Sequence, residues 1–138
     1  MLFFKKICAL LMFAFSNANA ATIDLGAVSE VGVGRVGNNV VRYVKTFSNS
    51  CLEVQVISPS LNWKILAASN YCGFDGKSFD HDFADAGFEN LSVKADGVHS
   101  TLSVTALRPV REQRWKCLIP VEGAVIKALK CSEVLRND

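Results

Sequence analysis

The sequence has few of the residues that carry hydrolytic or metal chemistry. It contains only two histidines, His81 and His99, and it lacks G-x-S-x-G, H-E-x-x-H and C-x-x-C motifs. A Ser-His-Asp triad needs a histidine between a nucleophile and an acid, and a zinc site needs cysteines or histidines at ligand spacing. We therefore expect no catalytic residue, no metal site and no cofactor. A pair of glycosidase-type carboxylates stays open, because such partners can lie far apart in a sequence.

Long apolar runs are also scarce, and the one at the N-terminus has the pattern of a secretory signal peptide. Residues 1–20 comprise a basic start ending in Lys5-Lys6, an apolar stretch over residues 7–15 and the small-residue end Ala18-Asn19-Ala20. A membrane-spanning helix needs about 20 apolar residues, so this stretch is too short to remain as an anchor. We expect cleavage after Ala20, no membrane span in the mature chain, and a periplasmic or secreted protein.

Residues 21–138 contain no internal repeat, low-complexity tract or linker rich in Pro, Gly or Ser, and they predict one domain. Cleavage would remove two of the 15 basic residues and none of the 13 acidic ones, which leaves 118 residues with 13 of each sign. A strongly basic protein would indicate nucleic acid or an anionic membrane as partner, whereas a neutral balance indicates neither. We expect no nucleic-acid partner.

The cysteines predict which disulfide bonds cross-link this domain. With Cys8 removed, the remaining cysteines are even in number: Cys51, Cys72, Cys117 and Cys131. An even number in an exported chain predicts two disulfides, and four cysteines allow three connectivities. We favour Cys51–Cys72 and Cys117–Cys131 because each pair brackets a predicted turn, and the other two connectivities stay open.

Apolar and polar residues alternate with period two over most of the mature chain, which predicts strands that bury one face. Three hairpins are expected: residues 31–47 around Gly37-Asn38-Asn39, residues 52–67 around Ser58-Pro59-Ser60, and residues 90–103 around Asp96-Gly97. The Asp96-Gly97 dipeptide is a strong signal for a two-residue turn. Such a turn pairs Ala95 with Val98, Val93 with Ser100 and Leu91 with Leu102, so the apolar residues share a face.

A further strand is expected after Arg108-Pro109, and Pro120 should end it. The strand carries two alternating sets of side chains, with Trp115, Cys117 and Ile119 on one side and Arg114 and Lys116 on the other. Residues 124–135 fit both a helical stripe and a strand, and we favour a strand that ends near Cys131.

Besides residues 124–135, the one helical candidate is residues 78–86, where Ser78 could cap the first turn and Phe79 and Phe83 would share a face. Taken together, these elements predict a mainly β domain. We expect a small antiparallel sandwich or barrel of about seven strands, with one short helix at most and two disulfides.

Two matches to ligand-binding motifs lack the context that the motifs need. Residues 32–37 match the letters of G-x-G-x-x-G, but they lie before a hairpin turn and not between a strand and a helix. We interpret them as strand glycines at a bulge or a close approach of the backbone. A calcium loop starting at Asp80 would need Gly at position 85, where the chain has Asp85. We interpret that region as a solvated acidic loop or short helix.

Charge is segregated along the chain, and this defines two candidate partner surfaces. The acidic set is Asp75, Asp80, Asp82, Asp85 and Glu89, and the basic set is Arg108, Arg111, Arg114 and Lys116. Either the two sets face each other within the fold, or one of them binds a protein of opposite charge.

These observations favour a small exported binding protein, not an enzyme, that inhibits or neutralises an envelope enzyme or toxin. Its partner would be another envelope or secreted protein. A second hypothesis is an accessory or structural component of an envelope assembly for secretion, adhesion or conjugation, which would pair through exposed strand edges. A third is a small hydrolase, which would need His99 or a carboxylate pair to line a pocket.

Overall fold

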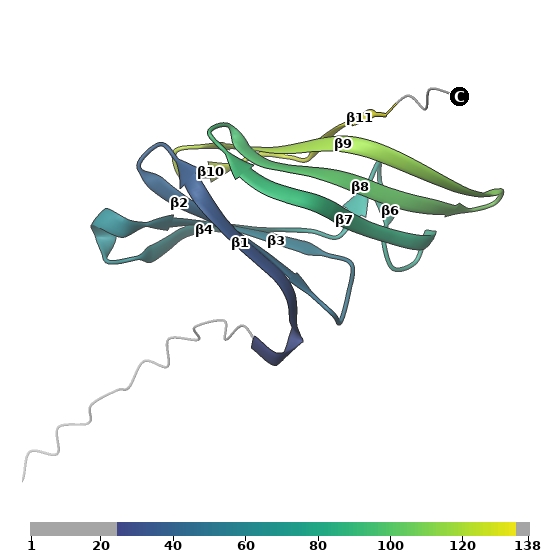
Figure 1. Ribbon diagram of the computed structural model, residues 1–138, viewed down its shortest axis with the longest axis horizontal. Coiled ribbons are helices and arrows are strands. Elements are labelled where there is room, and N and C mark those ends of the chain that lie inside the picture. The colour runs from purple at the N-terminus through teal and green to yellow at the C-terminus, as the bar shows by residue number, and fades with distance from the viewer. Residues whose placement is uncertain (1–24, 135–138) are drawn as a thin grey trace, which may run out of the picture.

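Two antiparallel sheets face each other and form a half-barrel in the computed structural model, which describes residues 25–134 (Figure 1). The first sheet has the order β1-β2-β3-β4, and its strands are Val28–Val36, Asn39–Thr46, Leu52–Ser58 and Lys64–Tyr71. The second has the order β10-β9-β8-β7, with β11 also paired to β9. Its strands are Phe83–Lys94 (β7), Gly97–Leu107 (β8), Val110–Glu122 (β9), Val125–Ile126 (β10) and Lys130–Glu133 (β11).

Seven of the strands, β1–β4 and β7–β9, have 7 to 13 residues, so the predicted mainly β fold of about seven strands is confirmed. A two-stranded ribbon of β5 (Gly73–Phe74) and β6 (Lys77–Ser78) connects the two sheets. The only helical segments among the described residues are the 3-10 turns Leu25–Ala27 and Pro59–Leu61. The predicted signal peptide, residues 1–20, lies outside the described range.

The helix predicted at residues 78–86 is wrong. Asp82 closes a turn there, because its carboxylate accepts the Ser78 N–H at 2.6 Å while its own N–H donates to the Ser78 carbonyl at 2.9 Å. The chain then enters β7 at Phe83. Phe79 is buried edge-to-face against Phe88, with 5.5 Å between ring centroids. Burial of the Phe79 ring under the second sheet therefore overrides the helical spacing of Phe79 and Phe83.

Gly32 and Gly34 lie on the inward face of β1, and Val31 and Val33, which alternate with them, point outward. A Cβ on Gly32 would overlap the Tyr43 ring, and one on Gly34 would lie 2.6 Å from the Cβ of Val93. Tyr43 and Val93 thus fill the space in front of the glycines, while Val31 and Val33 are 56% and 66% exposed. The interpretation of these glycines as positions of close approach is confirmed.

Side chains of β2 hold the two sheets together where β1 lies beside β7. The Tyr43 hydroxyl donates to the Leu91 carbonyl at 3.2 Å, and Lys45 Nζ donates to the Phe88 carbonyl at 2.6 Å. Burial, together with the Glu30 carboxylate, raises the pKa of Tyr43 from its already high ordinary value.

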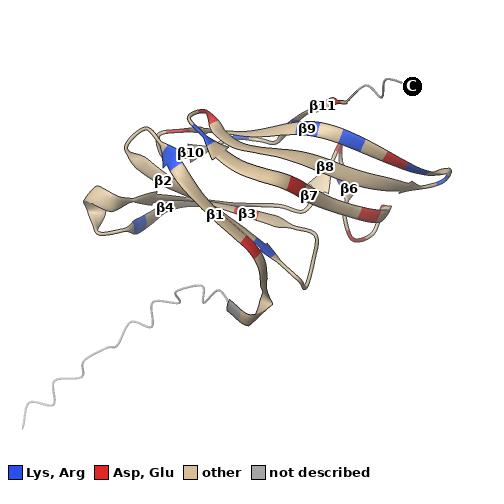
Figure 2. Cartoon of the chain, viewed as in Figure 1, with Lys and Arg blue, Asp and Glu red and all other residues tan. Residues whose placement is uncertain are grey.

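Between the sheets lies an apolar core, although charged residues occur on strands of both sheets (Figure 2). On the side away from β1, the core is closed by β10, which lies against β3 and β4. Here the Tyr71 hydroxyl donates to the Lys127 carbonyl at 2.6 Å. The largest fully buried side chains come from both sheets and are Phe88, Leu52, Leu102, Ile119, Val41, Val54, Val56, Val98 and Val104.

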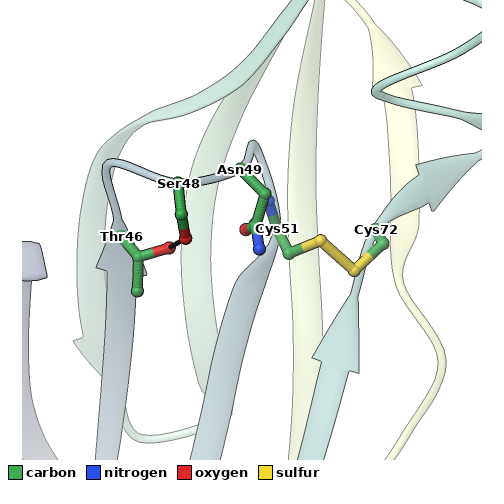
Figure 3. Close-up of a disulfide and its surroundings, with 5 residues drawn as sticks. All are labelled: Thr46, Ser48, Asn49, Cys51 and Cys72. Carbon is green, nitrogen blue, oxygen red and sulfur yellow. Dashed lines mark hydrogen bonds between the residues drawn. A yellow bond between two sulfur atoms is a disulfide. The ribbon is translucent and has the colours of Figure 1, made fainter. Parts of the chain in front are cut away.

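Both predicted disulfides form, so the favoured connectivity is confirmed. Cys51–Cys72 joins the start of β3 to the end of β4, where the chain leaves the first sheet (Figure 3). The Cys51 N–H donates to Asn49 Oδ1 at 3.0 Å, and the Cys72 carbonyl accepts the Phe79 N–H at 3.0 Å. Cys117 and Cys131 lie directly opposite each other on β9 and β11.

The register predicted for the third hairpin is wrong by two residues next to the turn and by three beyond a bulge at residues 89–92, where Leu102 pairs with Phe88. Val93 pairs with Val98, and the turn residues are Ala95 and Asp96. Gly97 is needed at the start of β8 because a Cβ there would overlap the Ile119 carbonyl of β9. A shift of two residues keeps the faces of β8, so Val98, Ser100 and Leu102 are buried as expected.

Pro120 does not end β9, which continues to Glu122. The Pro120 carbonyl accepts the Lys127 N–H at 2.9 Å, on the side away from β8. Because the nitrogen of a strand residue points to the same side as its carbonyl, the missing N–H takes no bond from the β8 ladder. The predicted strand within residues 124–135 is confirmed, divided between β10 and β11.

Replacing Gly34 by alanine is expected to lower the free energy of unfolding by about 1–3 kcal/mol, because the new methyl group overlaps Val93. Gly87→Ala is the matched control, since nothing lies within 4 Å of its Cβ position on β7. It should leave stability unchanged or raise it by about 0.5 kcal/mol. Urea unfolding measures both, and equal effects of the two substitutions would contradict the close approach at Gly34.

Candidate functional site

Parts of the two predicted charged surfaces lie side by side at one end of the domain, which we call the hairpin end. It comprises the β8–β9 turn, residues 107–111, and residues 80–85, which are the end of the loop before β7 and the first residues of that strand. Phe83 at the start of β7 pairs with Ala106, directly before the turn. Figure 2 shows acidic residues at the start of β7 and basic residues at the β8–β9 turn beside it.

The apex of the hairpin end is apolar and exposed. Leu107 and Val110 are 50% and 77% exposed, and they face each other across the turn. Arg108 and Arg111 are exposed beside them. Among residues 25–134, no carboxylate lies within 4.0 Å of either arginine's side-chain nitrogens. The hairpin end therefore presents apolar side chains flanked by charge that the fold leaves unpaired.

The rest of the basic set does not reach the hairpin end. An extended strand rises about 3.3 Å per residue, so residues 108–116 spread over roughly 25 Å. Arg114 pairs with Glu89 at 2.7 Å and with Glu112 at 3.5 Å, which shows that the acidic and basic sets partly face each other within the fold. Lys116 lies farther along β9, opposite Thr101.

Asp75 is also separate from the hairpin end. It lies at the β5–β6 turn and lines a hollow of about 670 Å³ together with Phe74, Trp115 and Lys130. The Phe74 and Trp115 rings pack with their centroids 5.0 Å apart. Trp115 is half-buried against the core, on the side opposite Lys116 as expected.

The two histidines lie apart from each other. His81 is exposed in the loop before β7, whereas His99 lies on the outer face of β8 and lines a hollow of about 510 Å³. His99 Nε2 lies 2.6 Å from Asp96 Oδ1, and this hydrogen bond lowers the pKa of Asp96. In the described part of the chain, Asp96 is the only side chain bonded to the ring. One requirement of the hydrolase hypothesis is thus met, because His99 lines a hollow. A second requirement is not met, because no nucleophile is bonded to the His99 ring in the described residues.

Lysines surround His99 in this second hollow, which we call the lysine hollow. It lies where β8, β9 and β11 run side by side. Its lining comprises Lys94, His99, Lys116, Leu118, Lys130, Ser132 and the Cys117–Cys131 disulfide. Sequence analysis found Lys116 but missed Lys94 and Lys130, because no local pattern shows that β11 lies beside β9.

Within residues 25–134, no group of three or more His, Cys, Asp or Glu side chains is arranged to hold a metal ion. No helix in that range is long and apolar enough to span a membrane. Comparison of the chain with protein families, curated proteins and solved structures finds no match. Functional inference therefore depends on the surfaces described above.

Acid should weaken the fold through Asp96 and Glu122, whose pKa values are lowered by hydrogen bonds to His99 and Lys127. A lowered folded-state pKa contributes stability above the usual values of 3.8 and 4.5, and this contribution is lost as the pH falls through the folded-state value. Between about pH 4.5 and pH 2.5, D96N/E122Q should therefore lose less Tm than the wild type.

The control for this pH experiment is D80N/D85N, which removes two exposed carboxylates that have no ion-pair partner within 4.0 Å. Its acid transition should match that of the wild type. If D96N/E122Q and the wild type showed identical slopes of Tm against pH, Asp96 and Glu122 would not be the groups whose protonation weakens the fold in acid.

Proposed function

We propose that this protein is a periplasmic or secreted binding protein that docks on another protein through the hairpin end and inhibits or neutralises an envelope enzyme or toxin. One observation carries the proposal: an exposed apolar apex, Leu107 and Val110, lies between unpaired arginines and an acidic loop. Protein interfaces commonly combine a desolvated apolar centre with a polar and charged rim.

Rigidity of the β8–β9 ribbon supports an inhibitory role. The two strands pair without interruption from Gly97 and Pro120 to Leu107 and Val110. Along β9, the pairing with β11 ends at Trp115, so the last part of the ribbon extends past β11 (Figure 1). A projecting turn on a rigid ribbon can enter a cleft and loses little conformational entropy on binding.

Charge at the hairpin end supports a partner with complementary potential. The exposed Arg108 and Arg111 lie on one strand pair, and Asp80 and Asp85 lie on the neighbouring loop and strand. A partner surface with the reverse arrangement would be steered into one orientation during encounter.

Export is part of the same proposal. The predicted signal peptide at residues 1–20 supports it, and so do the two disulfides, since disulfides form and persist in oxidising compartments.

An assembly component is the second candidate, and a different feature favours it. The edge of β9 over residues 110–113 has no strand beside it in the described part of the chain. The Arg114 carbonyl accepts the Val134 N–H at 3.0 Å, so by alternation the backbone of Glu112 also faces this open side. An added strand from a neighbouring molecule could pair there. Concentration-dependent association in solution would favour this candidate over a monomeric inhibitor.

Reversal of charge at the hairpin end tests the inhibitor proposal. The oxidised domain, residues 21–138, is used to capture a partner from envelope extract, and the captured protein is then purified. R108E/R111E should slow association with that protein by about tenfold or more at low salt. L107S/V110S should speed dissociation, because it removes the apolar centre.

The matched control is R35E/K64E, which makes the same charge change at exposed positions of the first sheet. Its association rate should stay within about twofold of the wild type. Wild-type protein should also reduce the enzymatic or toxic activity of the partner. Equal kinetics for all three variants, or a partner whose activity is unaffected, would refute the proposal.

A further inference from the structure

The lysine hollow is a second charged surface, and it shares no residue with the hairpin end. Strand register explains how it forms: His99 pairs with Leu118, Leu118 pairs with Lys130, and Lys116 pairs with Ser132. Neighbouring strands lie about 4.8 Å apart, and diagonal neighbours such as Lys116 and Lys130 about 7–8 Å. Their side chains therefore share one face, beside Lys94 from the end of β7.

Positive charge in the hollow has no contacting counter-charge. Among the described residues, no carboxylate lies within 4.0 Å of the ammonium groups of Lys94, Lys116 or Lys130. Two carboxylates interact with these lysines at longer range, Asp96 with Lys94 and Glu122 with Lys130. Asp96 is itself bonded to His99, and Glu122 is bonded to Lys127.

The same sheet neutralises Arg114 with two glutamates, so the hollow differs from its surroundings. Like charges on neighbouring strands repel and destabilise the sheet, and an anion bound between them would remove that cost.

The volume of the lysine hollow and the chemistry of its lining indicate which kind of anion it can bind. A volume of about 510 Å³ lies within the range of small-molecule sites. Lysine ammonium groups bind phosphate as compact point charges, and a hydroxyl such as that of Ser132 adds a further donor. Leu118, on the same face as the lysines, adds an apolar surface on which the rest of the ligand can rest.

We propose that the lysine hollow binds a phosphate monoester, with Lys94, Lys116 and Lys130 around the phosphate. The three positive charges are enough to neutralise the nearly two negative charges that a phosphate monoester carries at neutral pH. The disulfide holds β11 against β9 and thereby keeps Lys130 and Ser132 beside Lys116. A soluble sugar phosphate and a lipid with a monoester headgroup share this chemistry.

Isothermal titration of the oxidised domain with glucose 6-phosphate tests the proposal, with glucose as the uncharged comparison. Flotation with phosphatidylcholine vesicles, with and without phosphatidic acid, tests the lipid source. We expect saturable binding of at least one phosphate monoester that weakens as salt concentration rises. K116Q/K130Q should weaken this binding by about tenfold or more, because it removes two of the three charges.

R35Q/K64Q removes the same charge from exposed positions on the first sheet and should change affinity less than twofold. Thermal unfolding of both variants checks that the fold is intact. The proposal is overturned if neither ligand binds, if glucose binds as well as its phosphate, or if the two variants lose affinity equally. None of these outcomes affects the protein-binding test at the hairpin end, whose variants lie outside the hollow.

Discussion

The close approach of β1 to β7 is the constraint on which the rest of the structure depends. Gly32 and Gly34 remove side chains from the inner face of β1, and the Tyr43 ring and Val93 occupy that space. Tyr43 and Lys45 can then reach carbonyls on β7. These two bonds satisfy polar groups that would otherwise be costly at the margin of an apolar core. The close approach also covers one edge strand of each sheet, β1 and β7, which limits pairing of these strands with other molecules.

Both candidate surfaces follow from this arrangement. Because the first sheet covers the inner face of the second, the outer face of β8, β9 and β11 remains free to carry the lysine hollow. The β8–β9 ribbon is paired with β7 as far as Ala106, directly before the turn, and it projects past β11 at its tip. A rigid core thus places a charged hollow on one face and an exposed turn at one end.

Sequence reasoning succeeded where the information is local and failed where it depends on packing between distant strands. Period-two alternation and cysteine proximity predicted the strands and both disulfides. The outward direction of Val31 and Val33 depends on what fills the space before the glycines, and the third hairpin's register depends on β9 beside Gly97. For the same reason, the sequence shows that residues 108–116 are basic but not where each side chain lies. Arg108 and Arg111 lie at the turn, Arg114 forms ion pairs, and Lys116 lines the lysine hollow.

Each sheet is built from one continuous stretch of chain, residues 28–71 and residues 83–133, and each disulfide joins cysteines that are consecutive in the sequence. For a chain that enters an oxidising compartment with its N-terminus first, Cys51 and Cys72 emerge before Cys117. Oxidation in the order of emergence then makes the native bonds directly. The connectivity of both bonds is therefore the one that sequential oxidation would produce, with no rearrangement of a wrong pairing.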